Sequence, residues 1–229
     1  MILLASLSLA HIKVGLKISH LIPLLLSQCL FAALAELSTP DPEEASLALM
    51  DSIVADFRSE AYDSALTKLI EFEKEKPYDP DVLNLLGSVY MKKKDFVSAT
   101  KYFDLSLNKK PGFFPAAFNY GELLFIQKKY TEARRYYQML ASQDPANELL
   151  QFKLALCDIE AGDDVRAKNS LNNIKYPGDS PAWYYAQAIW EYRHSNPKKA
   201  KAYTATAKSI FAEKTLLFDE TFSNLGIKL

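Results

Sequence analysis

Few side chains in this sequence have the types and the spacing that catalysis or metal binding requires. After residue 35 the chain contains one histidine, His194, and one cysteine, Cys157. A nucleophile needs a base within hydrogen-bonding reach, and a structural zinc site needs four ligands. Asp163 and Asp164 are adjacent acids, but they follow Gly162 at a predicted turn, where water solvates them. The pattern predicts no catalytic residues, no cofactor and no metal site.

The single histidine and the single cysteine both have ordinary structural explanations. His194 lies in the segment EYRHSNPKK, a predicted turn in contact with solvent. Cys157 stands at a small position beside a predicted helix contact, which suits a packed thiol. The sequence contains no glycine-rich phosphate loop and no G-x-S-x-G elbow. We therefore predict that the protein is not an enzyme.

The composition indicates a globular fold with a sizeable core. Of the 229 residues, 49% are hydrophobic, and there are 13 Tyr, 13 Phe and only 7 Gly. Such a chain buries enough apolar surface to offset the entropy lost when the backbone is ordered. The 27 basic and 28 acidic residues nearly cancel. This balance argues against nucleic acid as a partner, because phosphate binding needs an excess of positive charge. No small-molecule substrate is evident.

Residues 1–35 have the pattern of a secretory signal. They contain two lysines and no acid, and they lead into the apolar run LIPLLLSQCLFAALA at residues 21–35. Ala33 and Ala35 form an A-x-A cleavage site before Glu36. We expect export to the periplasm or cell envelope.

Three alternatives for the same segment stay open. The apolar run of residues 21–35 is shorter than the roughly 20 residues of a spanning helix, but it could be retained as a membrane anchor. Cys29 loosely resembles a lipidation site, although Gln28 before it fits that motif poorly. Translation from Val14 would leave a compact signal of ordinary form.

Two helical hairpins in the sequence are nearly the same and lie 34 residues apart. They are LGSVYMKKKDFVSATKYFDLS and YGELLFIQKKYTEARRYYQML. When 34-residue units are counted from Pro80 and from Phe114, the residues at six positions correspond: Leu86, Gly87, Tyr90, Ala99, Phe103 and Pro111 in the first, and Tyr120, Gly121, Leu124, Ala133, Tyr137 and Pro145 in the second. This pattern resembles the tetratricopeptide repeat, a 34-residue helix-turn-helix unit.

Three weaker units keep nearly the same step. The first of them has Ile53 where glycine is usual, and the fifth unit comes one residue early because of a loss within YPGDSP. The resemblance implies an all-α fold, a right-handed α-solenoid of about five hairpins. We expect a signal or anchor at 1–35, a linker and helix start at 36–45, the solenoid at 46–214 (repeats near 46–79, 80–113, 114–147, 148–180 and 181–214) and a capping helix and tail at 215–229.

The residue types at the shared positions have physical reasons. Gly87 and Gly121 are expected where the first helix of a hairpin approaches the second, because a side chain there would hold the helices apart. Large residues such as Phe103 then fill the space beside this contact. Pro111 and Pro145 end the second helices, since proline lacks the amide donor.

Other signals predict the ends of several helices. Asp79–Pro80 and Ser180–Pro181 each put a side-chain acceptor at the N-cap and a proline at the first helical position. Asp41–Pro42 does the same one turn before the first repeat, so that helix is expected to be longer. The segment at 212–226 is amphipathic and fits a terminal cap. The residues available for its apolar face are Leu216, Leu217, Phe222 and Leu225.

The resemblance also implies where a partner binds. In this family the first helices of successive hairpins line an inner groove. Here the groove positions are mostly apolar or aromatic, with few groups that could clamp a peptide carboxylate, and part of them could instead be core. The expected groove residues are Phe57, Arg58, Asn84, Met91, Lys92, Phe118, Glu122, Phe125, Phe152, Ile159, Tyr185 and Tyr192.

We therefore expect a non-catalytic scaffold or adaptor that binds an apolar or helical segment of a partner protein. An exposed apolar groove also allows self-association. One alternative is an accessory subunit of an envelope enzyme or a secretion complex. Another is the same binding protein tethered to the membrane through residues 21–35.

Overall fold

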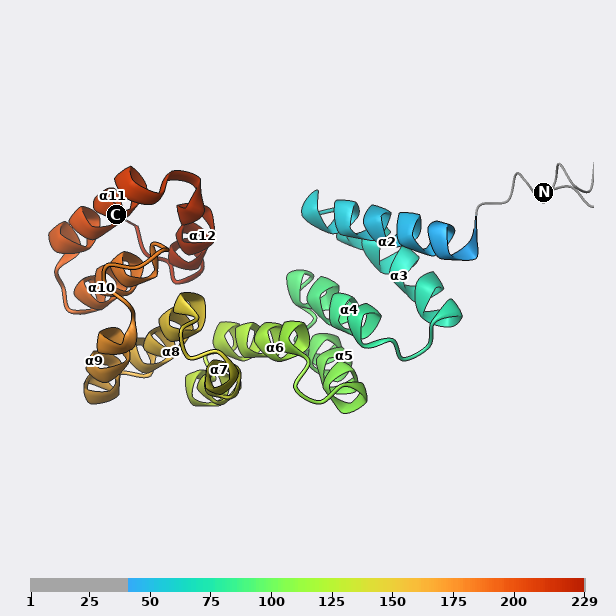
Figure 1. Ribbon diagram of the computed structural model, residues 1–229, viewed down its shortest axis with the longest axis horizontal. Helices are drawn as coiled ribbons and strands as arrows, with labels where there is room; N and C mark the ends of the chain where they lie inside the picture. The colour runs from blue at the N-terminus through green and yellow to red at the C-terminus, as the bar shows by residue number, and fades with distance from the viewer. Residues whose placement is uncertain (1–40, 229) are drawn as a thin grey trace, which may run out of the picture. The chain divides into compact units, whose positions relative to one another are not determined.

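The computed structural model describes residues 41–228, which form α-helices and one 3₁₀ helix and contain no strand (Figure 1). The predicted signal segment at 1–35 lies outside the described residues. In the described part, no helix has the length and apolar character needed to cross a membrane. The elements are α2 (Pro42–Arg58), α3 (Tyr62–Glu75), α4 (Pro80–Lys92), α5 (Phe96–Lys109), α6 (Phe114–Ile126), α7 (Tyr130–Gln143), α8 (Glu148–Glu160), α9 (Asp164–Asn173), α10 (Ala182–Arg193), α11 (Pro197–Phe211), η2 (Ala212–Thr215) and α12 (Leu216–Asn224).

The chain divides into two compact units, residues 1–51 and 52–229. Of the first unit, the structure describes only the segment that starts α2. There the Glu43 amide donates to the Asp41 carboxylate at 3.1 Å, as the predicted N-cap requires. Glu43 and Glu44 in the first turn complement the helix dipole. All that follows concerns the second unit.

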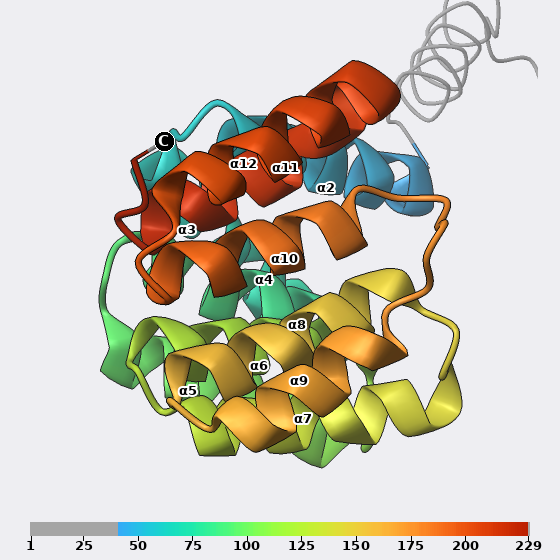
Figure 2. The ribbon, with the colours of Figure 1, turned by 90° about the vertical axis from the view of Figure 1, so that its left-hand side faces the viewer.

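Helices of the second unit pack in consecutive pairs. The most extensive contacts join α4 to α5, α6 to α7, α8 to α9 and α10 to α11. Further contacts join each pair to the next, between α5 and α6, α7 and α8, and α8 and α10. Figure 2 shows α10 and α11 next to α8 and α9. The unit is therefore a stack of helical hairpins in chain order.

The turn inside each hairpin has the same backbone conformation. The second residue after each first helix has a positive φ, between 61° and 72°. The next amide donates to the carbonyl five residues back, as in Asp95 to Tyr90 at 2.9 Å, which is a Schellman motif. These residues are 34 apart, except for a last step of 33: Glu60, Lys94, Lys128, Gly162 and Ser195.

Gly87 and Gly121 lie where the two helices of their hairpins meet. A Cβ atom on Gly87 would lie 2.6 Å from the Phe103 ring, and one on Gly121 would lie 2.8 Å from the Tyr137 ring. The predicted role of the glycines is confirmed. The close neighbour is the aromatic ring itself, so glycine is needed because the second helix presents a flat, bulky side chain.

The remaining hairpins carry side chains at both of these positions. Their second helices have leucine or threonine in place of the aromatic ring, which leaves room for a Cβ on the first helix. All the residues involved are buried: Ile53 with Leu69, Ala155 with Leu171, and Ala188 with Thr204.

Asp79 caps α4 as predicted. Its carboxylate accepts from the amides of Asp81 at 2.9 Å and Val82 at 3.2 Å, and Pro80 is the first helical residue.

The predicted N-cap at Ser180 is wrong. Helix α10 begins at Ala182, with Pro181 at the N-cap position. The Ser180 amide donates to a Glu148 oxygen at 3.0 Å, and its hydroxyl donates to the same carboxylate, so only a long 3.4 Å contact remains to the amide of Ala182. Glu148 starts α8 and also accepts from the Asp179 amide at 2.9 Å. The segment between α9 and α10 is thus held by a side chain of α8.

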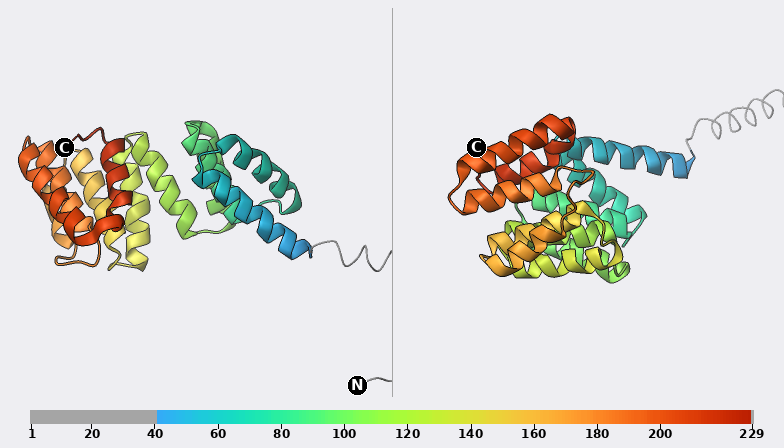
Figure 3. Two further views of the ribbon diagram at one scale, coloured as in Figure 1. Left: turned by 90° about the horizontal axis from the view of Figure 1, so that it is seen from above. Right: turned by 60° about the vertical axis from the view of Figure 1, so that its left-hand side comes forward.

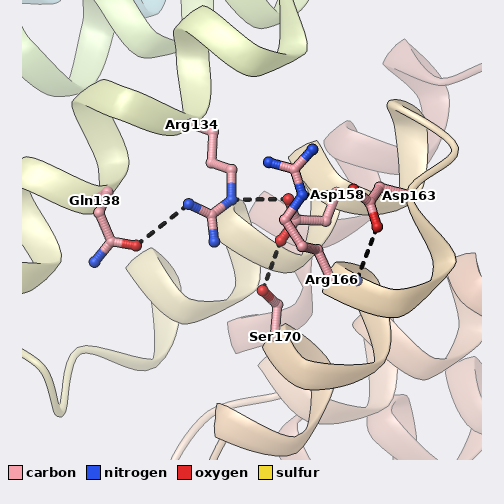
Figure 4. Close-up of polar contacts among 6 residues, drawn as sticks. All are labelled: Arg134, Gln138, Asp158, Asp163, Arg166 and Ser170. Carbon is pink, nitrogen blue, oxygen red and sulfur yellow. Dashed lines mark hydrogen bonds and ion pairs between the residues drawn. The ribbon is translucent and has the colours of Figure 1, made fainter.

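A buried carboxylate joins three helices (Figure 4). Asp158 of α8 has a side chain only 1% exposed. It accepts from Arg134 Nε of α7 at 2.7 Å and from the Ser170 hydroxyl of α9 at 2.6 Å. Within residues 41–228 no buried side-chain nitrogen or oxygen lacks a partner. The ion pair of Arg134 and Asp158 therefore links two hairpins without leaving a buried charge uncompensated.

Helix α12 packs onto α10, and its aromatic residues reach α8. The Phe218 ring lies 5.0 Å from the Phe152 ring and 5.2 Å from the Tyr185 ring, measured between centroids. The Tyr185 hydroxyl donates to Asp219 at 2.6 Å. Figure 3 shows this C-terminal part, in red, from two further sides.

The predicted apolar face of the C-terminal segment is half right. Phe222 is buried and Leu225 is half-buried against the core, as expected, whereas Leu216 and Leu217 are 68% and 49% exposed. The main anchor is Phe218, which the prediction omitted. A 3₁₀ helix ends and an α-helix begins at residues 215 and 216, so the residues before and after this junction do not share one helical face.

Candidate binding cleft

A cleft of about 620 Å³ opens between α4, α6 and α12, and we call it the cleft below. On α6 the lining residues Phe118, Glu122 and Phe125 follow a spacing of four and three, so they share one helical face. On α4 Ser88 and Met91 are arranged in the same way. The first helices of two hairpins therefore form two walls.

Helix α12 supplies the third wall. Leu217 and Thr221 line the cleft, followed by Leu225 just after the helix. Phe218 and Phe222 point to the opposite side and are buried in the core. One face of α12 is thus packed in the core, and another face lines the cleft.

A polar network crosses the floor between α4 and α6. The Asn119 amide nitrogen donates to Asn84 Oδ1 at 2.9 Å and to the Ser88 hydroxyl oxygen at 3.2 Å. Ser88 in turn donates to the Asn84 carbonyl at 2.9 Å. Asn84 and Ser88 are buried. Because these groups satisfy one another, the floor is fixed before any ligand binds.

Glu122 joins the cleft to the core. It accepts from Lys153 Nζ at 2.8 Å, with the lysine side chain only 6% exposed, and from the Tyr137 hydroxyl. Burial, together with the Glu122 carboxylate, raises the pKa of Tyr137 well above its usual range. At the rim, Lys92 of α4 pairs with Glu220 of α12 at 3.3 Å.

The structure brings seven of the twelve predicted groove residues to the cleft: Phe57, Asn84, Met91, Lys92, Phe118, Glu122 and Phe125. Arg58 is exposed at the end of α2, and Tyr192 is half-buried; neither lines the cleft. Phe152, Ile159 and Tyr185 are buried in the core cluster that includes Phe218 and Phe222. They do not line the cleft, since α12 lies over Phe152 and Tyr185.

Several cleft residues were not in the predicted set. Asn119 and Ile126 each follow a predicted groove residue on α6, so a wider window around those positions would have included them. Lys94 and Lys128 lie at the hairpin turns. The wall from α12 had no sequence signal, because an amphipathic pattern does not tell where a helix docks.

The lone histidine and cysteine lie away from the cleft. His194 stacks on Trp190 with ring centroids 3.8 Å apart, and its Nε2 atom lies 3.3 Å from Asp164. Cys157 is buried, and this burial raises the pKa of its thiol, which keeps it protonated. Among residues 41–228 no group of three or more His, Cys, Asp or Glu is placed to hold a metal ion.

Residues 124–189 match the sequence model of the tetratricopeptide repeat. They cover the end of α6, all of α7, the complete hairpin of α8 and α9, and most of α10, including the turns at Lys128 and Gly162 described above. The fold is a tetratricopeptide-repeat solenoid with a C-terminal helix.

Solved structures share this tetratricopeptide fold. A tetratricopeptide-repeat protein of Thermus thermophilus has a TM-score of 0.63 and 19% identity, over 80% of this chain and 100% of that one. PilW, described as a type IV pilus biogenesis factor, has a TM-score of 0.61 and 19% identity, over 80% and 87%. MamA of Desulfovibrio magneticus has a TM-score of 0.59 and 17% identity, over 72% and 94%. No curated protein matches the sequence.

Proposed function

We propose that this protein is a non-catalytic scaffold or adaptor that binds a helical segment of a partner protein in the cleft. The observation that carries the proposal is apolar surface left open beside a preformed polar floor. Ile126 and Leu217 both line the cleft and are 46% and 49% exposed. Apolar side chains gathered around a cavity are a usual mark of an interaction site.

The size of the cleft sets the size of the ligand. A helix is about 10 Å across, so roughly one to two turns of it would occupy 620 Å³. That length presents apolar residues at positions i, i+3 and i+4 to a groove. The partner segment is therefore short, with two or three apolar anchors.

We place this activity at the cell envelope. The signal-like pattern of residues 1–35 supports export, with tethering through residues 21–35 as the alternative. The fold likeness to PilW, a pilus biogenesis factor by its description, favours a role as an accessory subunit of an envelope assembly.

Affinity capture from an envelope fraction tests the proposal. The variant combines Ile126→Glu and Leu217→Glu, two exposed cleft positions where a charge does not disturb the core. The control combines Val97→Glu and Val165→Glu, which are 83% and 73% exposed and do not line the cleft. We expect a stoichiometric partner with the wild type and the control but not with the cleft variant. Equal capture by all three would contradict the proposal.

A further inference from the structure

The cleft has an excess of positive charge although the whole chain is nearly neutral. Four lysines and two glutamates line it. Lys153 pairs with Glu122 at 2.8 Å, and Lys92 pairs with Glu220 at 3.3 Å. For the other two, Lys94 and Lys128, residues 41–228 provide no carboxylate within 4 Å. Two positive charges at the cleft are thus without an acidic counterpart in the described part of the chain.

Lys94 and Lys128 occupy equivalent places in successive hairpins. Each is the positive-φ residue of its turn, with φ of 62° and 61°. Glycine adopts this conformation without strain, and Gly162 does so at the same place two hairpins after Lys94. The other equivalent places hold Glu60 and Ser195, so the turn itself does not select lysine, and only two of the five turns carry a positive charge there.

We propose that the partner segment is an acidic amphipathic helix, whose apolar anchors fill the cleft and whose carboxylates pair with Lys94 and Lys128. This inference rests on the proposed function and specifies the chemistry of its ligand. Charge complementarity favours an acidic partner helix over the chain's own apolar segment as the occupant of the cleft. The chain's own apolar segment at residues 21–35 contains no acid, and Lys13 and Lys17 precede it, so it does not complement a basic cleft.

The experiment measures binding of three blocked, fluorescently labelled 16-residue helical peptides to the full-length protein in detergent. All carry leucines at i, i+3 and i+4, and they differ only in having Glu, Gln or Lys at the flanking positions. We expect the Glu peptide to bind about 3- to 10-fold more tightly than the Gln peptide at low salt. The gap should close at high ionic strength.

Variants test whether Lys94 and Lys128 cause the difference in affinity between the Glu and Gln peptides. Lys94→Gln with Lys128→Gln should abolish the preference for Glu. The matched control is Lys129→Gln with Lys198→Gln, which removes the same charge from two exposed lysines that do not line the cleft. A second pair, Lys94→Gly with Lys128→Gly, should also lose the preference while the melting temperature stays the same or rises. A loss of preference in both the test and control variants would overturn the assignment.

The outcomes separate this inference from the proposed function. If the Glu and Gln peptides bind equally and Ile126→Glu with Leu217→Glu abolishes both, the cleft binds helices but the acidic partner is wrong. If the Lys peptide binds best, the inference is also overturned, in favour of a basic segment such as the chain's own N-terminal part. If no peptide binds, both the inference and the proposed function are overturned.

Discussion

The ring of Phe218 in α12 packs edge-on against the ring of Phe152 in α8, with centroids 5.0 Å apart. Phe152 was expected to face a partner. Its surface is instead covered by the chain's own C-terminal helix, so the part of the predicted groove that stays open is the cleft beside α4 and α6. Helix α12 therefore belongs both to the core and to the candidate site.

Replacement of Phe218 by alanine should lower the free energy of unfolding by about 3 kcal/mol. The side chain is 5% exposed and contacts two other aromatic rings, so its removal leaves a cavity. Urea denaturation followed by circular dichroism measures the change. Leu216→Ala, at a 68% exposed position, is the control and should change stability by less than about 0.5 kcal/mol. Equal effects would show that α12 is not part of the core.

Replacement of Gly87 by alanine should destabilise the protein by about 1–2 kcal/mol, despite the better helix propensity of alanine. The new Cβ would lie 2.6 Å from the Phe103 ring. Adding Phe103→Leu should recover part of the loss, because Ala155 and Leu171 form the equivalent pair in a later hairpin. A double-mutant cycle measures this coupling, which we expect to be about 1 kcal/mol. Additive effects would mean that the two residues do not interact.

Replacement of Asp158 by alanine should cost about 3 kcal/mol, since it leaves Arg134 and Ser170 without their buried acceptor. Thermal and chemical denaturation both report the loss. Asp179→Ala provides the comparison: its ion pair with Lys175 is exposed, and stability should hardly change. A small effect at Asp158 would show that water replaces the carboxylate.

At the positive-φ turns, replacing glycine and introducing glycine should change stability in opposite directions. Gly162→Ala should destabilise by about 1 kcal/mol, although a Cβ there has open space around it, because only the backbone conformation disfavours it. Ser195→Gly, at the equivalent place in the last hairpin, should stabilise by about 0.5 kcal/mol. Melting curves of the two variants test both signs. A loss of stability in each would show that the turn is not limited by φ.

His194 should make stability depend on pH around neutrality. The hydrogen bond to the Trp190 carbonyl, and then Asp164, raise the pKa of His194 in the folded state, against the opposing effect of burial. A raised folded pKa means that the stabilisation is complete below the unfolded pKa and is lost as pH rises through the folded pKa. His194→Gln should remove this fall, which sets in as pH rises above the unfolded pKa of about 6.5. The measurement is the wild-type minus variant difference in unfolding free energy, and a difference that is flat with pH would refute the expectation.

The repeat pattern could be predicted because its residues act within one hairpin. Gly87 and Phe103 are in neighbouring helices joined by a short turn, so their spacing along the chain reflects their contact. Asp79 is likewise a local signal, and it caps α4 as expected. Ser180 shows the limit of such signals. Its N-cap role was displaced by the carboxylate of Glu148, which is 32 residues away in the sequence.

The candidate site could be predicted only in part, for the same reason. Phe118 and Phe125 were found from their positions within a repeat, and they line the cleft. Tyr185 was assigned to the groove by the same rule but is buried under α12. The periodicity of α12 shows that it has an apolar face, and no local pattern tells which helix that face covers. Long-range docking therefore decides which groove positions remain open.

One turn conformation recurs in all five hairpins, and this affects how repeats can be gained or lost. The turns are at Glu60, Lys94, Lys128, Gly162 and Ser195. Each joint presents the same geometry to the helix that follows, so a whole period can be excised or duplicated between two joints without creating a new kind of connection. A deletion of residues 95–128, for example, would bring Lys129 directly after Lys94. The number of repeats can therefore change only by whole 34-residue units. The first and last helices of the solenoid, and not the turns within the hairpins, limit where a unit can be removed.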